Sequence, residues 1–293
     1  MRNRESCLGL CAVVLCAAAL SLAVFMQPLT AQGQKAAPVR TLRLYVFNCG
    51  TLHFDNADAY SLKKEEVAAT DMSVPCFLVT HPRGSLMFDA GIIPDTAFAP
   101  GGGPVTAGIA TSSTPLLPQL AAAGFSPADI TFLALSHYHS DHVANANAFA
   151  RSIWLTRKAE RDVMFSDPPP ARTAVETYDK LKNSTTKLIE RDEHDVFGDG
   201  TVNLKSTPGH TPGHQVLFVK LPKTGAVVLS GDLYHYPEER TLNRVPTREF
   251  NPQQTAASRA EIERFLARNK AQLWIEHDIT ANARLKKAPQ FYD

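Results

Sequence analysis

Short segments in which apolar residues alternate with polar ones, or run together, recur along the chain from residue 42 onward. Segments of this length, bounded by Gly, Pro, Asn and Ser, are typical of β-strands. They predict strands at 42–48, 76–80, 85–89, 130–135, 153–155, 202–206, 215–219, 226–230 and 273–275. Apolar positions at helical spacing predict helices at 116–123, 157–164 and 255–269. Strands interspersed with helices, without an internal repeat, indicate a single α/β domain with two sheets.

Two stretches of the chain lack this periodicity. Residues 95–114 are rich in Gly, Pro, Ser and Thr and are expected to form a long loop. Residues 166–200 are polar and begin with a run of prolines, and we expect a helix followed by a loop there. Hydrophobic residues still make up 44% of the 293 residues, which is enough for a sizeable core and excludes a disordered or fibrous chain.

The N-terminus has the layout of a secretory signal peptide. Arg2 and Arg4 precede an apolar run at residues 8–26, and the small residues Ala31 and Gly33 mark a plausible cleavage site. The run is also long enough to span a bilayer, so retention as an N-terminal anchor is the alternative. In either case the folded part is exported, to the periplasm or the exterior of the cell. We expect residues 1–33 to be the targeting segment and residues 34–293 to form the functional domain.

Charges of the two signs nearly cancel along the chain. The 30 Lys and Arg residues and 29 Asp and Glu residues leave a formal net charge of +1. No basic stripe is available to neutralise phosphates, which argues against nucleic acid as a partner. The sequence implies no protein partner, and a membrane would be a partner only if the N-terminal segment is retained.

The sequence leaves open whether the cysteines of the functional domain form a disulfide. Cys7, Cys11 and Cys16 lie in the targeting segment, so only Cys49 and Cys76 enter the functional domain. They could form a disulfide in an oxidising compartment, or both could be buried thiols that pack as hydrophobes. We favour buried thiols, because the sequence alone does not bring the two Cβ atoms together.

Histidines and acids gather directly after the apolar strand predicted at 130–135. The segment reads Ser136-His137-Tyr138-His139-Ser140-Asp141-His142. In extended backbone the side chains of His137 and His139 point to the same side. Asp141 and His142 lie at the start of the next helix, so their side chains can face a second position. Imidazole and carboxylate groups are ligands of divalent metals such as zinc. The arrangement therefore suits two adjacent metal ions better than one.

Further candidate ligands follow three later strands. They lie in Thr207-Pro208-Gly209-His210-Thr211-Pro212-Gly213-His214, in Gly231-Asp232 and in Glu276-His277-Asp278. In open α/β sheets the functional sites lie beyond the carboxyl ends of the strands. We therefore expect these side chains to lie close to the cluster at residues 137–142. No spacing ties four other histidines to this set, and we expect them to be structural or exposed: His53, His81, His194 and His214.

The segment from His137 to His142 resembles the HxHxDH signature of the metallo-β-lactamase superfamily. The three later motifs, and the turn Phe88-Asp89-Ala90-Gly91, are similar to those of the family in order and kind. The resemblance implies an αβ/βα sandwich, two mixed sheets flanked by helices, with a dinuclear site between the sheets. It implies that His137, His139 and His210 hold one metal, that Asp141, His142 and His277 hold a second, and that Asp232 bridges both. The expected cofactors are two divalent ions, with zinc favoured.

Details within the superfamily point to one branch of it. True β-lactamases resemble this N-terminal signature but have Cys or Ser in place of Asp232. Members of the glyoxalase II group carry an additional helical domain after the last ligand, and the residues that follow His277 in this chain are too few to form one. The chain most resembles the quorum-quenching N-acyl-homoserine lactonases, including its tail, Ala288-Pro289-Gln290-Phe291-Tyr292. Those lactonases usually place a Tyr three residues after the bridging Asp, where this chain has His235.

The resemblance and the ligand chemistry together predict a metal-dependent hydrolase of a small lactone or ester. Two ions sharing a water would supply hydroxide for attack on the carbonyl of a lactone ring. Asp141 can accept the proton and pass it to the leaving alkoxide, and Tyr234, His235 or Tyr236 could donate a hydrogen bond to the oxyanion. The alternatives are a phosphotriester or other ester hydrolase, a β-lactamase of the same superfamily, and a non-catalytic metal-binding protein with a vestigial site.

Overall fold

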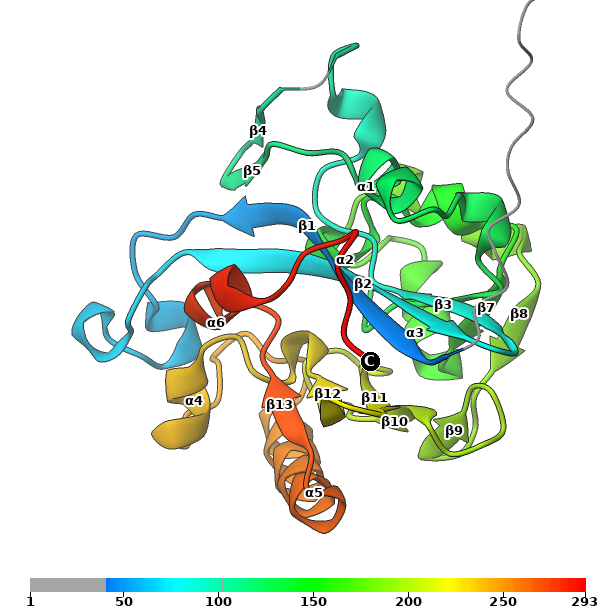
Figure 1. The fold of residues 1–293 in the computed structure, drawn as a ribbon. Helices are drawn as coiled ribbons and strands as arrows, with labels where there is room; N and C mark the ends of the chain where they lie inside the picture. The colour runs from blue at the N-terminus through cyan, green and yellow to red at the C-terminus, as the bar shows by residue number, and fades with distance from the viewer. Residues whose placement is uncertain (1–40, 102) are drawn as a thin grey trace, which may run out of the picture. The chain divides into compact units, whose positions relative to one another are not determined.

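The computed structural model describes residues 41–101 and 103–293, which form two β-sheets flanked by helices (Figure 1). The first sheet has eight strands in the order β4-β5-β1-β2-β3-β6-β7-β8, and the second has five in the order β13-β12-β11-β10-β9. The predicted targeting segment lies outside the described residues. Within the described part of the chain, no helix has both the length and the apolar character required to cross a bilayer.

The element bounds agree with most of the predicted ones. The strands of the first sheet are β1 (Arg43–Leu52), β2 (Met72–His81), β3 (Gly84–Phe88), β4 (Val105–Ala107), β5 (Ala110–Ser112), β6 (Phe132–Ala134), β7 (Ile153–Thr156) and β8 (Thr186–Leu188). Those of the second are β9 (Glu193–Asp195), β10 (Val202–Ser206), β11 (Gln215–Leu221), β12 (Gly225–Leu229) and β13 (Gln272–Trp274). The helices are α1 (Leu116–Ala122), α2 (Ser140–Val143), α3 (Lys158–Met164), α4 (Pro237–Thr241), α5 (Pro252–Asn269) and α6 (Ile279–Arg284).

Strand β1 shows why the central strands have nearly continuous apolar sequences. Successive side chains of a strand point to opposite faces of its sheet. Leu44 and Val46 belong to the core between the two sheets, whereas Tyr45 and Phe47 pack on the other face with α1. Both faces of the strand are buried, so both sets of positions are apolar. The predicted α/β sandwich is confirmed.

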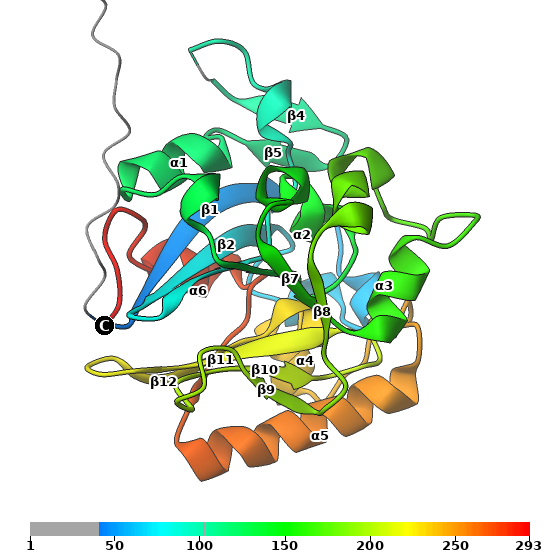
Figure 2. The same cartoon turned by 90° about the vertical axis from the view of Figure 1, so that its right-hand side faces the viewer.

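Helix α5 covers the outer face of the second sheet (Figure 2). Its apolar face carries Ile262, Phe265 and Leu266, which pack against Val216 and Phe218 of β11. The helix begins at Pro252, three residues earlier than predicted, because the Asn251 side chain accepts a hydrogen bond from the Gln254 N–H and caps the first turn. The result is a four-layered domain with the inter-sheet core at its centre.

Two loop predictions are wrong in part. Within residues 95–114, β4 and β5 form a hairpin that pairs with the edge of β1, and Thr111 lies opposite Thr51. Within residues 166–200, the expected helix is replaced by short 3-10 turns and the edge strands β8 and β9. Strands of three residues contain too few positions to show alternation, and Gly and Pro dominate the surrounding composition.

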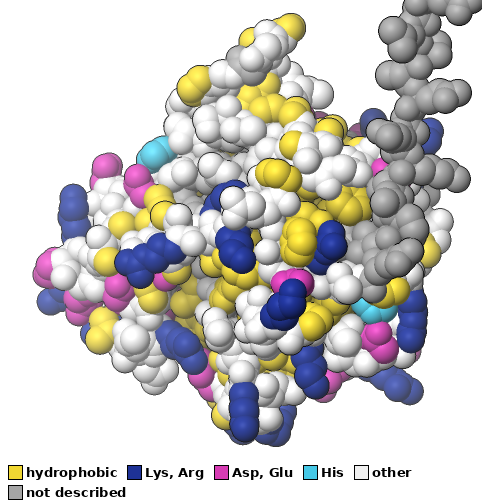
Figure 3. All heavy atoms as spheres, viewed as in Figure 1, with side chains coloured by type: hydrophobic (Ala, Val, Ile, Leu, Met, Phe, Trp, Pro, Cys, Tyr) yellow, Lys and Arg dark blue, Asp and Glu magenta, His cyan; other side chains and the backbone are white. Residues whose placement is uncertain are grey.

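Basic and acidic side chains are interspersed on the face of the molecule that Figure 3 shows. Lys and Arg groups are scattered over this face rather than gathered into one stripe. Helix α5 presents such a mixture, since its Glu261 pairs with both Arg264 and Arg268. Pairs of this exposed kind contribute little to stability.

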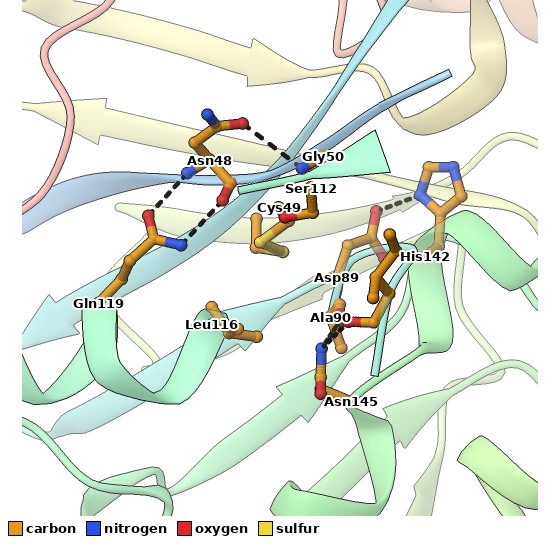
Figure 4. Close-up of a disulfide and its surroundings, with 12 residues drawn as sticks. Asn48, Cys49, Gly50, Asp89, Ala90, Ser112, Leu116, Gln119, His142 and Asn145 are labelled. Atoms are coloured by element: carbon orange, nitrogen blue, oxygen red, sulfur yellow. Dashed lines mark hydrogen bonds and ion pairs between the residues drawn. A yellow bond between two sulfur atoms is a disulfide. The ribbon is translucent and has the colours of Figure 1, made fainter. Parts of the chain in front are cut away.

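Cys49 and Cys76 form a disulfide, which corrects the favoured prediction of two buried thiols (Figure 4). The antiparallel pairing of β1 with β2 brings their Cα atoms to 5.9 Å, within the usual range for a bridge. Gly91, with a φ of +80°, lies against the bridge, where a Cβ atom would come 2.8 Å from Cys49 Cβ. The bridge therefore packs on the turn that holds Asp89.

Replacing Cys49 with alanine should destabilise the domain. The bridge closes a loop between residues 27 positions apart and so restricts the unfolded chain. Without it the unfolded chain gains conformational entropy, which should lower the free energy of unfolding by about 3–4 kcal/mol. Urea denaturation of the variant and the wild type measures the difference. Reduced wild type is the control and should resemble the variant. Equal stability of the variant and the oxidised wild type would contradict the prediction.

Candidate metal centre

The seven predicted ligands come together at the strand ends that the sequence indicated. The segments that carry them follow β6, β10, β12 and β13. All seven lie in two close groups, within each of which the candidate ligand atoms are no more than 4.8 Å apart. The groups are His137, His139, His210 and Asp232, and Asp141, His142, Asp232 and His277.

Asp232 offers one carboxylate oxygen to each group. Its Oδ2 lies 3.1 Å from Nε2 of His210 and 3.5 Å from Nε2 of His137. Its Oδ1 lies 2.9 Å from Nε2 of His277 and 3.0 Å from Nε2 of His142. A carboxylate placed between two sets of imidazoles in this way is suited to bridge two ions.

Two candidate ligand atoms at this centre are buried without hydrogen-bond partners among the described residues. They are His142 Nε2 and Asp232 Oδ1. His139 turns its Nδ1 towards His137 and His210. A buried polar atom without a partner is costly, and ligation of a metal ion is one way in which such atoms are satisfied. The donor set, imidazole nitrogens and carboxylate oxygens, fits divalent ions such as zinc. The residues present therefore fit the two-metal site that the sequence predicted.

The second ring nitrogen of each of three ligands is held by an acceptor. Nδ1 of His142 lies 2.8 Å from Asp89 Oδ2 (Figure 4), and Nδ1 of His277 lies 2.8 Å from the carbonyl of Ser73. Nδ1 of His210 lies 3.0 Å from Glu249 Oε1. Metal-bound histidines almost always give the other N–H to such an acceptor, which fixes the tautomer and the ring orientation.

Electrostatics favour the protonation states that a metal requires at three of the ligands, whereas the charge of Asp232 outweighs burial and raises the pKa of His142 and His210. Burial would raise the pKa of Asp232, but His277, His142 and His137 outweigh it and lower this pKa well below its ordinary value. Burial also lowers the pKa of His137 and of His139 well below the usual range. An ionised carboxylate and neutral imidazoles are the forms that bind metals.

A cavity of about 470 Å³ opens above the two groups. Asp141, Asp232 and His277 lie at its base. Its walls are mostly apolar and include Leu52, Phe54, Met72, Ile92 and residues 107–110 of the β4–β5 hairpin, together with Arg172 and His235. The hairpin that the sequence did not predict therefore forms one wall of the cavity.

Comparison with known proteins identifies the family. The family model described as the metallo-beta-lactamase superfamily matches residues 69–270. The chain belongs to the metallo-beta-lactamase superfamily.

Similar proteins of known name include N-acyl homoserine lactonases. The chain is 30% identical over 264 residues to an N-acyl homoserine lactonase AttM from Rhizobium radiobacter, covering 86% of this chain and 98% of that protein. An N-acyl homoserine lactonase from Bacillus sp is 28% identical over 257 residues, covering 85% of this chain and 98% of that protein. A crystal structure of a quorum-quenching N-acyl homoserine lactone lactonase superposes with a TM-score of 0.72 at 24% identity, covering 87% of this chain and 100% of that one. This last likeness supports the fold alone.

Of the three predicted oxyanion donors, only His235 lines the cavity of about 470 Å³ in this metallo-beta-lactamase domain. The Tyr234 hydroxyl donates to Glu263 on α5, and the Tyr236 hydroxyl donates to the carbonyl of Thr70. Both hydroxyls are therefore engaged away from the ligands. The predicted role of these two tyrosines does not agree with their positions.

His214 is structural, one of the two predicted alternatives, but it contacts the metal centre, which no spacing in the sequence indicated. It is fully buried, and its Nε2 accepts a hydrogen bond of 3.0 Å from the backbone N–H of Asp232. Burial lowers the pKa of His214 to about 3, so the ring is neutral and can act as an acceptor. His214 thus positions Asp232. Of the other three histidines, His53 is exposed, His81 is buried against Asp199, and His194 is half-buried.

Glu160 supports the loop that carries His210, and the sequence gave no signal of this role. Its buried carboxylate accepts hydrogen bonds from the Thr211 hydroxyl and from the backbone N–H groups of Tyr138 and Gly213. On the other side of the loop, a Cβ atom at Gly209, where φ is +140°, would lie 2.2 Å from the Thr255 nitrogen of α5. The loop is therefore clamped between α3 and α5.

Replacing Glu160 with alanine should destabilise the domain by roughly 3 kcal/mol, because three buried donors would lose their acceptor. Urea unfolding measures this change. Glu160→Gln, which keeps one acceptor oxygen, is the matched control and should lose less stability. A Glu160→Ala variant as stable as the Gln variant would show that these hydrogen bonds do not support the loop.

Proposed function

We propose that this protein is a metal-dependent lactonase that opens the ring of N-acyl homoserine lactones. The observation that carries the proposal is Asp232, which divides its two oxygens between two ligand groups at the base of an apolar-walled cavity. Support also comes from relatives that match along most of their length and are N-acyl homoserine lactonases.

The cavity has the chemistry expected for such a substrate. An N-acyl homoserine lactone has a polar ring and an apolar acyl chain. The polar base can receive the ring, while Leu52, Phe54 and Ile92 offer an apolar surface to the acyl chain. A volume of about 470 Å³ lies in the range of small-molecule sites.

Asp141 is the residue best placed to move a proton. Its Oδ2 lies 3.5 Å from Nε2 of His142 and 3.6 Å from Nε2 of His277, on the cavity side of the second group. Although burial would raise its pKa, His142 outweighs this effect and lowers the pKa below the ordinary value, so the carboxylate is ionised at neutral pH. It can accept a proton from the attacking water and return it to the alkoxide that leaves when the ester bond breaks.

Two divalent ions held by these groups would lower the pKa of a water molecule towards neutrality and polarise the lactone carbonyl. The identity of the native metal is also a proposal. We propose zinc because every ligand is an imidazole or a carboxylate. Elemental analysis of the purified protein should then find two zinc ions per chain. Iron, cobalt or manganese in their place would reject zinc and leave the lactonase proposal intact.

Turnover of a substrate panel tests the proposal. The metal-loaded protein should open N-acyl homoserine lactones with a kcat/KM above its values for plain lactones, a cephalosporin and a phosphotriester. A higher value for the cephalosporin or the phosphotriester would assign the protein to another branch of the superfamily. Failure to hydrolyse any of the four would favour a vestigial metal site.

We also propose that the domain is exported to the periplasm or the exterior of the cell. Arg2, Arg4 and the apolar run at 8–26 carry this proposal, and the Cys49–Cys76 disulfide supports it because such bridges persist in oxidising compartments. Mass spectrometry of protein from its native host should find the N-terminus near residue 33. An intact Met1 on protein recovered from the cytoplasm would contradict export.

A further inference from the structure

Tyr60 lies in the wall of the cavity, beside the predicted metal ligands. It lines the cavity of about 470 Å³ together with Asp141, Asp232 and His277. It also lines a smaller cavity of about 180 Å³, which His210 borders. The segment between β1 and β2 that carries Tyr60 is far in sequence from every ligand. A side chain that the sequence did not single out therefore borders the metal centre.

The hydroxyl of Tyr60 is not engaged elsewhere. It forms no hydrogen bond within the part of the chain that the structure describes, whereas the Tyr234 hydroxyl donates to Glu263 and the Tyr236 hydroxyl donates to the carbonyl of Thr70. Of these three tyrosines, Tyr60 is the one that lines the cavity of about 470 Å³. Its hydroxyl is therefore available to a ligand in that cavity.

The turn that carries Tyr60 is anchored to a distant loop. Tyr60 ends a short 3-10 turn. The carbonyl of Ala59 accepts a hydrogen bond of 2.9 Å from the N–H of Thr247, and the Ser61 hydroxyl donates to the carbonyl of Val245 at 2.7 Å. Both neighbours of Tyr60 are thus held, so the position of the tyrosine is set before a substrate arrives. Such preorganisation is what makes a hydrogen-bond donor effective in catalysis.

Aromatic packing holds the ring of Tyr60 at the metal centre. Its centroid lies 4.6 Å from that of the His235 ring and 5.1 Å from that of Tyr236. His235 lines the cavity too, but its Nε2 lies 3.2 Å from Oδ2 of Asp232. That ring nitrogen therefore faces a carboxylate, and the hydroxyl of Tyr60 is the less committed donor of the two.

The surroundings of Tyr60 keep its hydroxyl protonated. Burial has the largest effect and, with the charges of Asp232 and Asp141 among the further causes, raises the pKa of Tyr60 well above its ordinary value. A protonated phenol is a hydrogen-bond donor. The hydroxyl also lies near enough to both carboxylates for their charges to act on it, which places it on the side of the metal centre.

We propose that Tyr60 is a catalytic residue whose hydroxyl donates a hydrogen bond to the carbonyl oxygen of the lactone ring. Negative charge develops on that oxygen when the carbonyl carbon is attacked, and a positioned donor stabilises this charge. The proton stays on Tyr60, so no bond of the tyrosine is made or broken. This inference rests on the proposed function. It names a donor outside the segment after Asp232, where the sequence placed its three candidates.

The kinetics of Tyr60→Phe, which lacks the hydroxyl and keeps the ring, test the inference. Removal of one such donor typically lowers kcat by 10²–10³-fold. We expect kcat to fall by about 100-fold or more, with a smaller change in KM and an unchanged metal content. Tyr45→Phe is the matched control, because Tyr45 packs against Phe125 and Phe291 in the core, and it should keep the wild-type rate.

The outcomes separate this inference from the proposed function. If the wild type opens a lactone and Tyr60→Phe retains its kcat, the role of Tyr60 is overturned and the lactonase proposal stands. Loss of metal from the variant would also overturn the role, because the tyrosine would then support the metal centre. A wild type that is inactive towards every lactone would reject the proposed function, and the role of Tyr60 with it.

A cyclic phosphonate that mimics the ring-opening transition state gives a readout without turnover. Its phosphonyl oxygen stands for the developing oxyanion, so Tyr60→Phe should weaken its binding by about the same factor as kcat/KM falls. In a crystal structure of the wild type with this phosphonate, we expect the Tyr60 oxygen about 2.5–3.0 Å from a phosphonyl oxygen. A separation of more than about 4 Å, beyond hydrogen-bond range, would overturn the inference even if the variant failed to fold.

Discussion

Replacing Asp232 with alanine is expected to abolish lactone hydrolysis and to remove at least one metal ion per chain. The carboxylate lies within 3.5 Å of His137, His142, His210 and His277, so both ligand groups lose their shared member. The loss in kcat/KM should be on the order of 1,000-fold or more, since even one electrostatic stabiliser of a transition state contributes 10²–10³. Elemental analysis and lactone turnover measure the two effects together.

Asp162→Ala is the control for that experiment. Asp162 is an exposed carboxylate on α3 that pairs with Lys158, and its loss should change neither the metal content nor the rate. A fully active Asp232→Ala protein that still holds two ions would contradict the bridging role.

Asp141→Asn should slow catalysis while retaining metal. The amide oxygen can still serve as a ligand, but an amide cannot accept the proton that the ionised carboxylate accepts. General acid–base groups contribute typically 10²–10⁴-fold, so we expect kcat to fall by about 100-fold or more with a smaller change in KM. Steady-state kinetics and elemental analysis on the same sample separate the two roles. Loss of the second ion in this variant would show that Asp141 acts mainly as a ligand, and an unchanged kcat would exclude it as the proton carrier.

The positions of the seven ligands could be predicted because they follow a pattern local to the sequence. Each group comes directly after a short apolar strand, and the carboxyl ends of such strands lie at one edge of a sheet. The segment after β6 shows this most clearly, since His139 is extended at the start of α2, the short helix that carries Asp141 and His142. The two-sheet α/β domain followed from strands interspersed with helices, and the sandwich arrangement followed from the resemblance to the family.

The residues that support the ligands could not be predicted, because the chain brings them from distant positions. Glu249 lies 39 residues after His210, and Glu160 lies 51 residues before Thr211. A single buried glutamate on a helix has no sequence signature that names its partner. The same reason explains the disulfide, since Cys49 and Cys76 meet only through the register of β1 with β2.

Lactone hydrolysis by the metal-free protein during titration with zinc tests the central claim most directly. We expect no ring opening without metal, and we expect the activity to rise to a maximum at two ions per chain. The ring opening of an N-acyl homoserine lactone can be followed by the acid it releases. A rate that does not depend on metal, or a protein that holds two ions and leaves the lactone intact, would contradict the account.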